Sequence, residues 1–273
     1  MTSNATVATA APWRAAFLSD MESMESPNFT LSSLRRTSAA ASHTSSSGPQ
    51  YAPRVRTVVY RGMWACLQPN SKNPASLNPA AYETDLPTIT TDVRMEKVPE
   101  ILQSGDNAEK HNESQSGLGG PVEATFWATD SMTQWRLRGS ACLIGPDIDS
   151  DEATPVRNLL MRHMRQKGQN GAWSWNRELT AHFGNLSPYM RGTFRNPPPG
   201  TPITRKPAQG LGLGHKVEDV QDAVARENFR VLIIVPEEMD RLDLSNKEKA
   251  QRWNYKLEWT GDEGFWKETE LWP

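Results

Sequence analysis

The sequence has little cysteine: only Cys66 and Cys142 occur among its 273 residues. Two cysteines so far apart in the chain exclude the disulfide scaffold that holds many small secreted domains together. Both lie in apolar stretches, and for that reason we expect buried free thiols rather than a reactive pair.

Long hydrophobic runs are also missing. The longest purely aliphatic stretch, residues 231–235, is far too short to span a bilayer. The N-terminus lacks a basic start followed by an apolar core, which is the pattern of a secretory signal. The sequence therefore predicts a cytoplasmic protein with no membrane partner.

Several signatures of function are absent as well. A net charge of −2 gives no general attraction to nucleic acid. The five histidines form no metal-ligand spacing with one another or with cysteine, so we expect no metal site. The sequence contains neither a Walker loop nor a nucleophile elbow, and it leaves any catalytic residue unknown.

The length and composition favour a single domain over residues 1–273 rather than two. A hydrophobic fraction of 37% is enough for a sizeable core. Four polar segments, rich in Ser, Asn, Gly or Pro, are expected to be loop insertions: residues 37–50, 70–86, 104–121 and 196–214.

The remaining segments alternate between strand and helix patterns. Strands are expected at residues 29–34, 55–60, 88–91, 123–128, 134–143 and 229–235, with a closing hairpin in 253–273. Helices are expected at residues 12–24, 94–103, 155–167, 173–183 and 217–227. Many strands with few helices, in this order, predict an α+β barrel.

Basic residues gather where two of these strands end. Arg54, Arg56 and Arg61 bracket the strand at 55–60, and Arg94 and Lys97 open the helix after the next strand. A cation beside a helix start suits a phosphate, because free backbone N–H groups and a positive charge converge there. The alternative interpretation is that these residues are solvated strand ends.

The order of these pieces resembles the pyridoxamine 5'-phosphate oxidase-like FMN-binding split-barrel family, and especially its uncharacterised bacterial, plant and fungal members. The pieces are APWRAAFLSDM, FTLSSLRR, PRVRTVVYRG, TITTDVRMEKVPEIL, EATFWATDSMTQWRLRGSA, NPPPGTP, DRLDLS, QRWNY and the final LWP. The resemblance implies an α+β fold, a six-stranded antiparallel split β-barrel with flanking helices. It also implies a homodimer that binds two FMN molecules across its interface.

The resemblance implies a role for eight residues in binding FMN. Arg56 matches an arginine that approaches the FMN phosphate, and Arg61 matches the basic residue that ends the same strand. Lys97 matches a phosphate-binding lysine, with Arg94 beside it as a helper.

The other four residues match positions along the flavin. Thr90 and Thr91 match a pair at a strand end that touches the flavin and its ribityl chain. Gln134 matches a glutamine that meets the flavin ring from the partner subunit, and Arg252 matches a C-terminal arginine that also reaches FMN.

The departures from the family pattern fall mainly on the vitamin B6 side. Glu96 stands where true oxidases have the first residue of an Arg-Lys pair. Glu248 and Ala250 replace the Arg-x-His that holds the substrate, and Leu242 replaces a tryptophan that packs on FMN. An acidic residue facing a substrate phosphate would repel it by about 1–4 kcal/mol at contact distance.

Three functions compete on this evidence. The first is an FMN-dependent oxidoreductase acting on an unidentified small molecule. The second is a genuine pyridoxamine 5'-phosphate oxidase of vitamin B6 metabolism, which the residues at 248 and 250 disfavour. The third is a flavin-binding module without catalytic activity.

Overall fold

The computed structural model describes residues 5–37, 50–105, 115–168 and 172–273. Within these ranges the chain has an α+β fold around one mostly antiparallel sheet of nine strands, as the sequence predicted for the fold class. The strands are β1 (Thr6–Val7), β2 (Asn28–Thr37), β3 (Gln50–Val59), β5 (Thr88–Asp92), β6 (Gly117–Ala128), β7 (Thr133–Ile144), β9 (Phe229–Asp243), β10 (Gln251–Thr260) and β11 (Glu263–Leu271). A separate two-stranded sheet pairs β4 (Tyr82–Glu83) with β8 (Arg165–Gln166).

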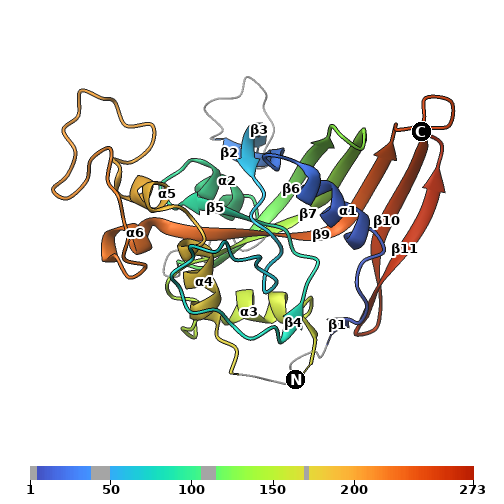
Figure 1. Ribbon diagram of the computed structural model, residues 1–273, viewed down its shortest axis with the longest axis horizontal. Helices are drawn as coiled ribbons and strands as arrows, with labels where there is room; N and C mark the ends of the chain where they lie inside the picture. The colour runs from blue at the N-terminus through green and yellow to red at the C-terminus, as the bar shows by residue number, and fades with distance from the viewer. Residues whose placement is uncertain (1–4, 38–49, 106–114, 169–171) are drawn as a thin grey trace.

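Short helices cover both sides of the sheet (Figure 1). They are α1 (Arg14–Ser23), α2 (Lys97–Gln103), α3 (Thr154–Met161), α4 (Trp175–Gly184), α5 (Pro188–Gly192) and α6 (Ala223–Asn228), with a 3-10 turn η3 at Thr193–Arg195. In Figure 1, α1 and α2 lie on one side of β9 and α3 and α4 on the other. No helix in the described part of the chain is long and apolar enough to cross a membrane.

Strand β9 organises the sheet because it pairs along both edges. One edge pairs with β7, while the other pairs with β5 over residues 229–233 and with β10 over residues 238–243. Beyond β7 the order continues through β6 and β2 to β3. The chain leaving β3 then bonds to the chain entering β5, through Arg61 N to Thr88 O at 2.8 Å and Trp64 N to Leu86 O at 2.9 Å. Hydrogen-bonded neighbours thus follow one another from β3 through β5, β9, β7, β6 and β2 back to β3.

Two apolar clusters pack against opposite faces of β9. Leu232 and Ile234 belong to the cluster that includes residues of α1 and α2. Val231, Ile233 and Val235 belong to the cluster that includes residues of α3 and α4. A strand covered on both faces is apolar at every position rather than at alternate ones. This explains the aliphatic run that the sequence shows at residues 231–235.

The strands predicted at residues 123–128 and 134–143 are confirmed as parts of β6 and β7, which pair as a hairpin. Trp135 and Leu137 are buried, whereas Arg136 and Arg138, which alternate with them along the strand, are exposed. Trp135 is fully enclosed, and its indole Nε1 donates to Asp20 of α1 at 2.7 Å. The hairpin therefore presents one face to the core and the other to the surface.

The loop expected at residues 104–121 is partly wrong. Residues 106–114 lie outside the described part, but residues 117–121 belong to β6. A Cβ on Gly119 would lie 2.8 Å from the carbonyl oxygen of Ala141, and a Cβ on Gly120 would lie 2.4 Å from the backbone of Ser104. The glycines are there because the end of α2 and strand β7 approach this backbone closely, not because the chain turns freely.

The other expected insertions have different outcomes. Residues 70–86 include the short strand β4 and the fully buried Leu86, so this segment is more structured than its composition indicated. Residues 196–214 contain no helix or strand, and residues 38–49 lie outside the described part. Three helices are shorter than expected at one end: α2 begins at Lys97 and so leaves Arg94 outside it, α3 ends at Met161, and α6 begins only at Ala223.

Candidate functional site

Glu100, on α2, is the centre of a cluster of basic side chains. Its Oε1 accepts hydrogen bonds from Nε and Nη2 of Arg35 at 3.0 and 2.7 Å, and its Oε2 accepts one from the Ser33 hydroxyl at 3.0 Å. Arg56 also pairs with Oε2, and Arg54 lies 3.9 Å from Oε1. The Glu100 side chain is only 3% exposed. Three arginines therefore share one buried carboxylate.

Strand periodicity puts these side chains on one face. Arg54 and Arg56 are two positions apart on β3, and Ser33 and Arg35 are two positions apart on β2, which is the neighbouring strand in the sheet. Residues two apart on a strand point to the same side. Arg54 and Arg56 were expected from the sequence, whereas Ser33, Arg35 and Glu100 were not. The signal that could have indicated them is the pattern S-x-R on one strand opposite R-x-R on the next.

Lys97 lies beside this cluster without an acidic partner. Its Nζ donates to the Thr91 hydroxyl at 3.1 Å and lies 2.8 Å from the sulfur of Met95. Among the described residues, no carboxylate lies within ion-pair distance of Nζ. Burial, and next the positive charge of Arg56, lower the pKa of Lys97 to about 8. A cation held in this way is stabilised by an anion that binds close to it.

Glu96 departs from the family pattern, yet its charge is matched. Its side chain is 82% exposed, and its carboxylate pairs with Nη2 of Arg35 at 2.7 Å. The group then has four cations, Arg35, Arg54, Arg56 and Lys97, against the two carboxylates of Glu96 and Glu100. The difference, four minus two, leaves two positive charges in one small region.

Two further predicted residues lie near Lys97 without joining it. Arg94 donates two hydrogen bonds to Asp92, from Nε to Oδ1 at 2.9 Å and from Nη2 to Oδ2 at 2.6 Å. Its Nη2 also donates to the carbonyl oxygen of Phe194 at 3.3 Å. Its guanidinium therefore already has hydrogen-bond partners within the protein. Thr90 precedes Thr91 on β5, so its side chain points to the opposite face of the strand.

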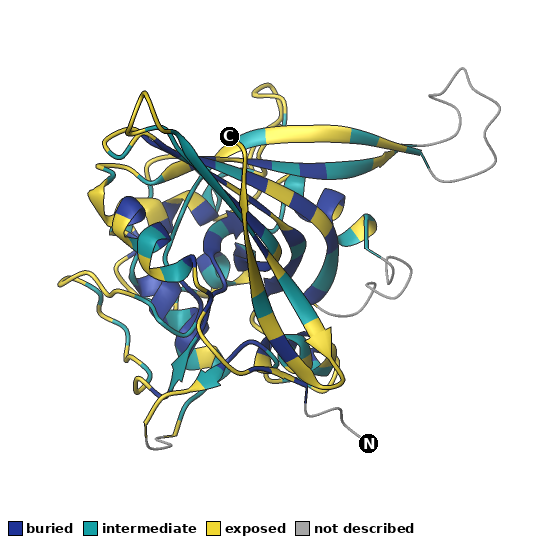
Figure 2. Ribbon diagram, turned by 90° about the vertical axis from the view of Figure 1, so that its right-hand side faces the viewer, coloured by how far each residue is buried: buried dark blue, intermediate teal, exposed yellow. Residues whose placement is uncertain are grey.

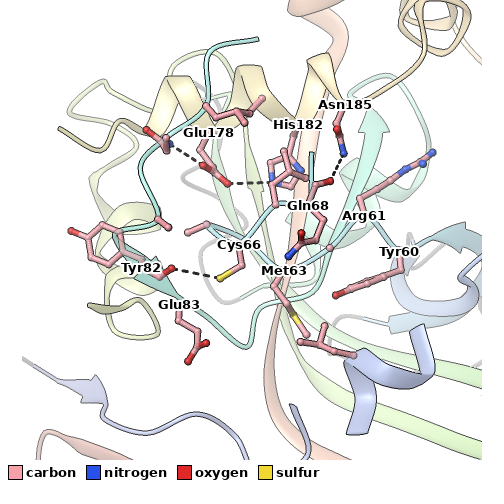
Figure 3. Close-up of a pocket in the computed structure, with 18 of the residues that line it drawn as sticks. Tyr60, Arg61, Met63, Cys66, Gln68, Tyr82, Glu83, Glu178, His182 and Asn185 are labelled. Carbon is pink, nitrogen blue, oxygen red and sulfur yellow. Dashed lines mark hydrogen bonds and ion pairs between the residues drawn. The ribbon is translucent and has the colours of Figure 1, made fainter. Parts of the chain in front are cut away.

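Arg61 lies at the end of β3 and lines a cavity. Burial lowers the pKa of its guanidinium, and in the described part of the chain its Nε has no hydrogen-bond partner. The cavity has a volume of about 680 Å³ and lies between the chain that follows β3, helix α1 and helix α4 (Figure 3). Of the eight predicted residues, Arg61 alone lines this cavity.

Gln134 and Arg252 lie elsewhere, on the surface of β7, β9 and β10. Gln134 is opposite Leu242 in the register of β7 and β9, and Leu242 is opposite Arg252 in the register of β9 and β10. Arg252 donates through Nε to Asp240 at 3.0 Å, and Arg136 donates to the same carboxylate at 2.9 Å. Among the described residues, no hydrogen bond or ion pair joins this group to Arg56 or Lys97. One chain therefore does not bring all eight residues together.

Glu248 and Ala250, which replace the Arg-x-His of the family pattern, lie just before Arg252 in the chain. Glu248 is exposed in the turn between β9 and β10, where its backbone N–H bonds to the side chain of Asn246 at 3.0 Å. Ala250, half-buried, directly precedes β10. Neither residue supplies a cation or an imidazole to this part of the surface.

Both cysteines are free, as the sequence predicted. Cys142 is buried, but Cys66 is only half-buried and lines the cavity. Burial raises the pKa of both thiols, so neither is favoured as a thiolate nucleophile. Among the described residues, no group of three or more His, Cys, Asp or Glu side chains could hold a metal ion.

Residues 10–145, about half of the chain, match the family model described as "Pyridoxamine 5'-phosphate oxidase, FMN-binding domain". The chain belongs to this family. The matched stretch contains Glu100 and seven of the eight predicted residues, all but Arg252.

The chain is also similar to two known proteins. The chain is 27% identical over 100 residues to an uncharacterized protein of Saccharomyces cerevisiae, YGR017W, and the match spans 36% of this chain and 34% of the yeast protein. A crystal structure from Nostoc punctiforme PCC 73102, of a pyridoxamine 5'-phosphate oxidase-related, FMN binding protein, superposes with a TM-score of 0.55 at 18% identity. It covers 97% of this chain and 99% of that one. At this identity the likeness shows a common fold.

Proposed function

We propose that the protein binds FMN, with the flavin phosphate beside Lys97, Arg56 and Thr91. The observation that carries the proposal is Lys97, a partly buried ammonium next to Arg56 with its pKa lowered to about 8. No carboxylate pairs with it in the described residues. A phosphate dianion placed there would accept hydrogen bonds from the ammonium, the Thr91 hydroxyl and the guanidinium of Arg56.

The charge of the cluster fits a dianion. Its two excess positive charges equal the two negative charges of a phosphate monoester near neutral pH. Each charge-assisted hydrogen bond to such a group contributes roughly 1.5–3 kcal/mol. Helix α2 has only seven residues, so the proposed site depends on side chains rather than on the helix dipole.

We place Gln134 and Arg252 in the same site through a second copy of the chain. They lie on the face of β7, β9 and β10, apart from Lys97, so a homodimer that buries this face would add them to the partner's cluster. Trp127, which is 39% exposed on β6 and lies opposite Gln134 in the register of β6 and β7, supplies aromatic surface for such an interface. Trp253 follows Arg252 on β10, so its side chain points to the other face and packs against the core. Trp135 does not supply such surface either, since it is part of the core.

The hydrogen-bonded path through β2, β3, β5, β9, β7 and β6 supports a six-stranded split barrel as the body of each subunit. Residues 146–228 would then be an addition to one side of that barrel, within a single domain. Strands β10 and β11 extend the sheet beyond the path.

Bound FMN would supply hydride or electron transfer at the flavin ring, and we propose an oxidoreductase for a small-molecule substrate. The protein would contribute a fixed orientation of the ring and a binding site for that substrate. A genuine pyridoxamine 5'-phosphate oxidase is the second candidate, and a flavin-binding module without activity is the third.

The test is a comparison of FMN with riboflavin, which lacks the phosphate. Lys97→Ala should weaken FMN binding by roughly 10- to 150-fold, because about 1.4 kcal/mol corresponds to a factor of ten. The same variant should bind riboflavin as the wild type does. Lys206→Ala, in the exposed segment 196–214, is the matched control and should change neither affinity. Unchanged FMN affinity in Lys97→Ala would contradict the proposed position of the phosphate.

A further inference from the structure

The cavity beside Arg61 contains a polar pair that the proposed FMN site does not use. Apolar and aromatic residues such as Leu18, Met21, Tyr60, Met63 and Tyr82 make up most of its wall, and the charged residues Arg14, Glu22, Glu83 and Lys167 also line it. A volume of about 680 Å³, apolar walls and a few polar groups are typical of small-molecule sites. Helix α4, which supplies Glu178 and His182, lies outside the stretch that matches the family model.

The polar pair is Glu178 and His182, one helical turn apart. Their side chains are 5% and 1% exposed, and Nε2 of His182 lies 3.7 Å from Oε1 of Glu178 (Figure 3). This separation is too long for a hydrogen bond. The other carboxyl oxygen, Oε2, accepts from Asn78 at 2.8 Å. In the described part of the chain, Oε1 and Nε2 themselves have no hydrogen-bond partner of ordinary geometry.

Two buried polar atoms without partners are a costly arrangement. Each such group costs about 1–3 kcal/mol relative to a satisfied one, and native proteins leave few of them. Here the two atoms lie close enough for one ligand group to contact both. A hydroxyl meets the requirement, because its oxygen accepts one hydrogen bond while its hydrogen donates another.

Burial disfavours the charged form of both members of the pair. Burial lowers the pKa of His182 to about 3. Burial also raises the pKa of Glu178, against the opposing effects of Asn78 and the backbone amide of Ala65. Because burial disfavours charge on both groups, the pair matches an uncharged ligand group better than an ionised one.

The surroundings hold the pair in place. The ring of Trp64 stacks on the His182 imidazole, with centroids 5.5 Å apart and planes at 12°. The adjoining turn closes with a hydrogen bond from Cys66 N to Met63 O, and its residue Ala65 has a left-handed φ of 58°. A non-glycine residue in this conformation costs of order 1–3 kcal/mol, and such strain is concentrated at binding sites.

We propose that this cavity binds a small, uncharged aromatic molecule whose hydroxyl bridges Oε1 of Glu178 and Nε2 of His182. The aromatic ring of the ligand packs against the apolar wall, and the hydrogen bonds to the polar pair fix its orientation. Arg61 also lines the cavity, but its side chain extends away from the pair (Figure 3). The site depends on the cavity and the pair and not on FMN.

The experiment uses the full chain as purified, with phenol as the probe and toluene as the probe without a hydroxyl. Phenol should bind at least about tenfold more tightly than toluene by calorimetry, because its hydroxyl satisfies two buried groups. In His182→Phe, which keeps an aromatic ring against Trp64, this preference should be lost or reversed. His163→Phe removes a buried histidine that does not line the cavity, and should keep the preference.

The outcomes decide the proposal whether or not each variant folds. Equal affinities of phenol and toluene for the wild type would mean a merely apolar void. No binding of either at millimolar concentration would mean that water alone fills the space. Either result would overturn the proposal, and both measurements need only the wild-type protein.

A structural role for His182 makes a different prediction from a ligand-binding role. His182→Phe removes an unpartnered buried nitrogen, so the ligand-free melting temperature should stay the same or rise. A large fall in that temperature would assign the histidine to stability instead. Failure of FMN binding would leave the phenol result unchanged, so the two proposals are tested separately.

Discussion

Arg56 of β3 and Glu100 of α2 form an ion pair across 44 positions of the sequence. Ser33 reinforces it, since its hydroxyl donates to Glu100 at 3.0 Å and accepts from Arg56 at 2.7 Å. The same carboxylate holds Arg35, so one acidic residue fixes two arginines against the sheet. Glu100 thereby keeps like charges close together at the position where we place the FMN phosphate.

This relationship predicts opposite effects of Glu100→Gln on stability and on binding. The variant leaves Arg35, Arg54 and Arg56 without their shared carboxylate, so the FMN-free protein should lose about 1–3 kcal/mol of unfolding free energy. It also raises the excess charge from two to three. A unit charge roughly 10 Å from a phosphate dianion, at an effective dielectric constant of about 20, contributes about 3.3 kcal/mol, so FMN should bind at least roughly a hundredfold more tightly.

Thermal unfolding with and without FMN checks both effects. The matched control is Glu258→Gln, which removes the carboxylate from a surface ion pair with Lys267 at 3.5 Å and should change stability by less than about 1 kcal/mol. Weaker FMN binding in Glu100→Gln would mean that Glu100 mainly positions the arginines and that its charge is secondary.

A second prediction concerns pH. Because the Lys97 pKa is about 8 in the free protein, the ammonium is increasingly deprotonated above pH 8, and FMN binding must then take up a proton. The dissociation constant for FMN should rise by about tenfold per pH unit above that value. Riboflavin affinity should not follow this dependence, since riboflavin has no phosphate.

Lys97 also gives the stability of the FMN-free protein a dependence on pH, opposite in sign to that of FMN affinity. The folded pKa of Lys97 lies below the ordinary value of 10.5, so between about pH 8 and 10.5 the unfolded chain binds more protons. The contribution of Lys97 to unfolding free energy therefore increases with pH in this window. Lys97→Arg is the control. Because its guanidinium stays charged, FMN affinity and unfolding free energy should both depend less on pH.

Local patterns in the sequence predicted much of this fold. The strand pattern at residues 134–143 identified β7, and the aliphatic run at 231–235 identified the buried strand β9. The glycines at 119 and 120 were misleading, because their small size serves close packing of α2 and β7 on β6 rather than a turn.

The candidate sites were harder to predict because they depend on contacts distant in sequence. Arg56 and Lys97 carry a residue type that indicates phosphate binding. Nothing local connects Arg35 to Glu100, which lies 65 positions away. Glu178 and His182 look like an ordinary amphipathic pair until the fold places them against the chain that follows β3.

The residues at 248 and 250 predict poor activity on pyridoxamine 5'-phosphate. Glu248 would repel the substrate phosphate, and Ala250 supplies neither a hydrogen bond nor a charge. Steady-state assays should give at best slow turnover with a high Michaelis constant. The double variant Glu248→Arg, Ala250→His should bind this substrate more tightly, because it restores the cation and the imidazole that the resemblance implies at these positions. Robust wild-type turnover with a micromolar Michaelis constant would instead favour the oxidase of vitamin B6 metabolism.

The proposed dimer predicts complementation between two defective chains. If each FMN contacts Lys97 from one subunit and Arg252 from the other, the Lys97→Ala and Arg252→Ala homodimers each have two damaged sites. A mixed dimer of the two variants has one site with both substitutions and one with neither. Co-expression with two different affinity tags and sequential purification isolates the mixed dimer.

The mixed dimer should bind one FMN with wild-type affinity, measured by quenching of flavin fluorescence, while each variant homodimer should bind roughly 10- to 150-fold more weakly. Arg136 still pairs with Asp240 in the Arg252→Ala chain, so that carboxylate keeps a partner. If no tight site returns in the mixed dimer, Lys97 and Arg252 do not serve one FMN across subunits. A monomer by light scattering at micromolar concentration with FMN present would exclude the shared site altogether.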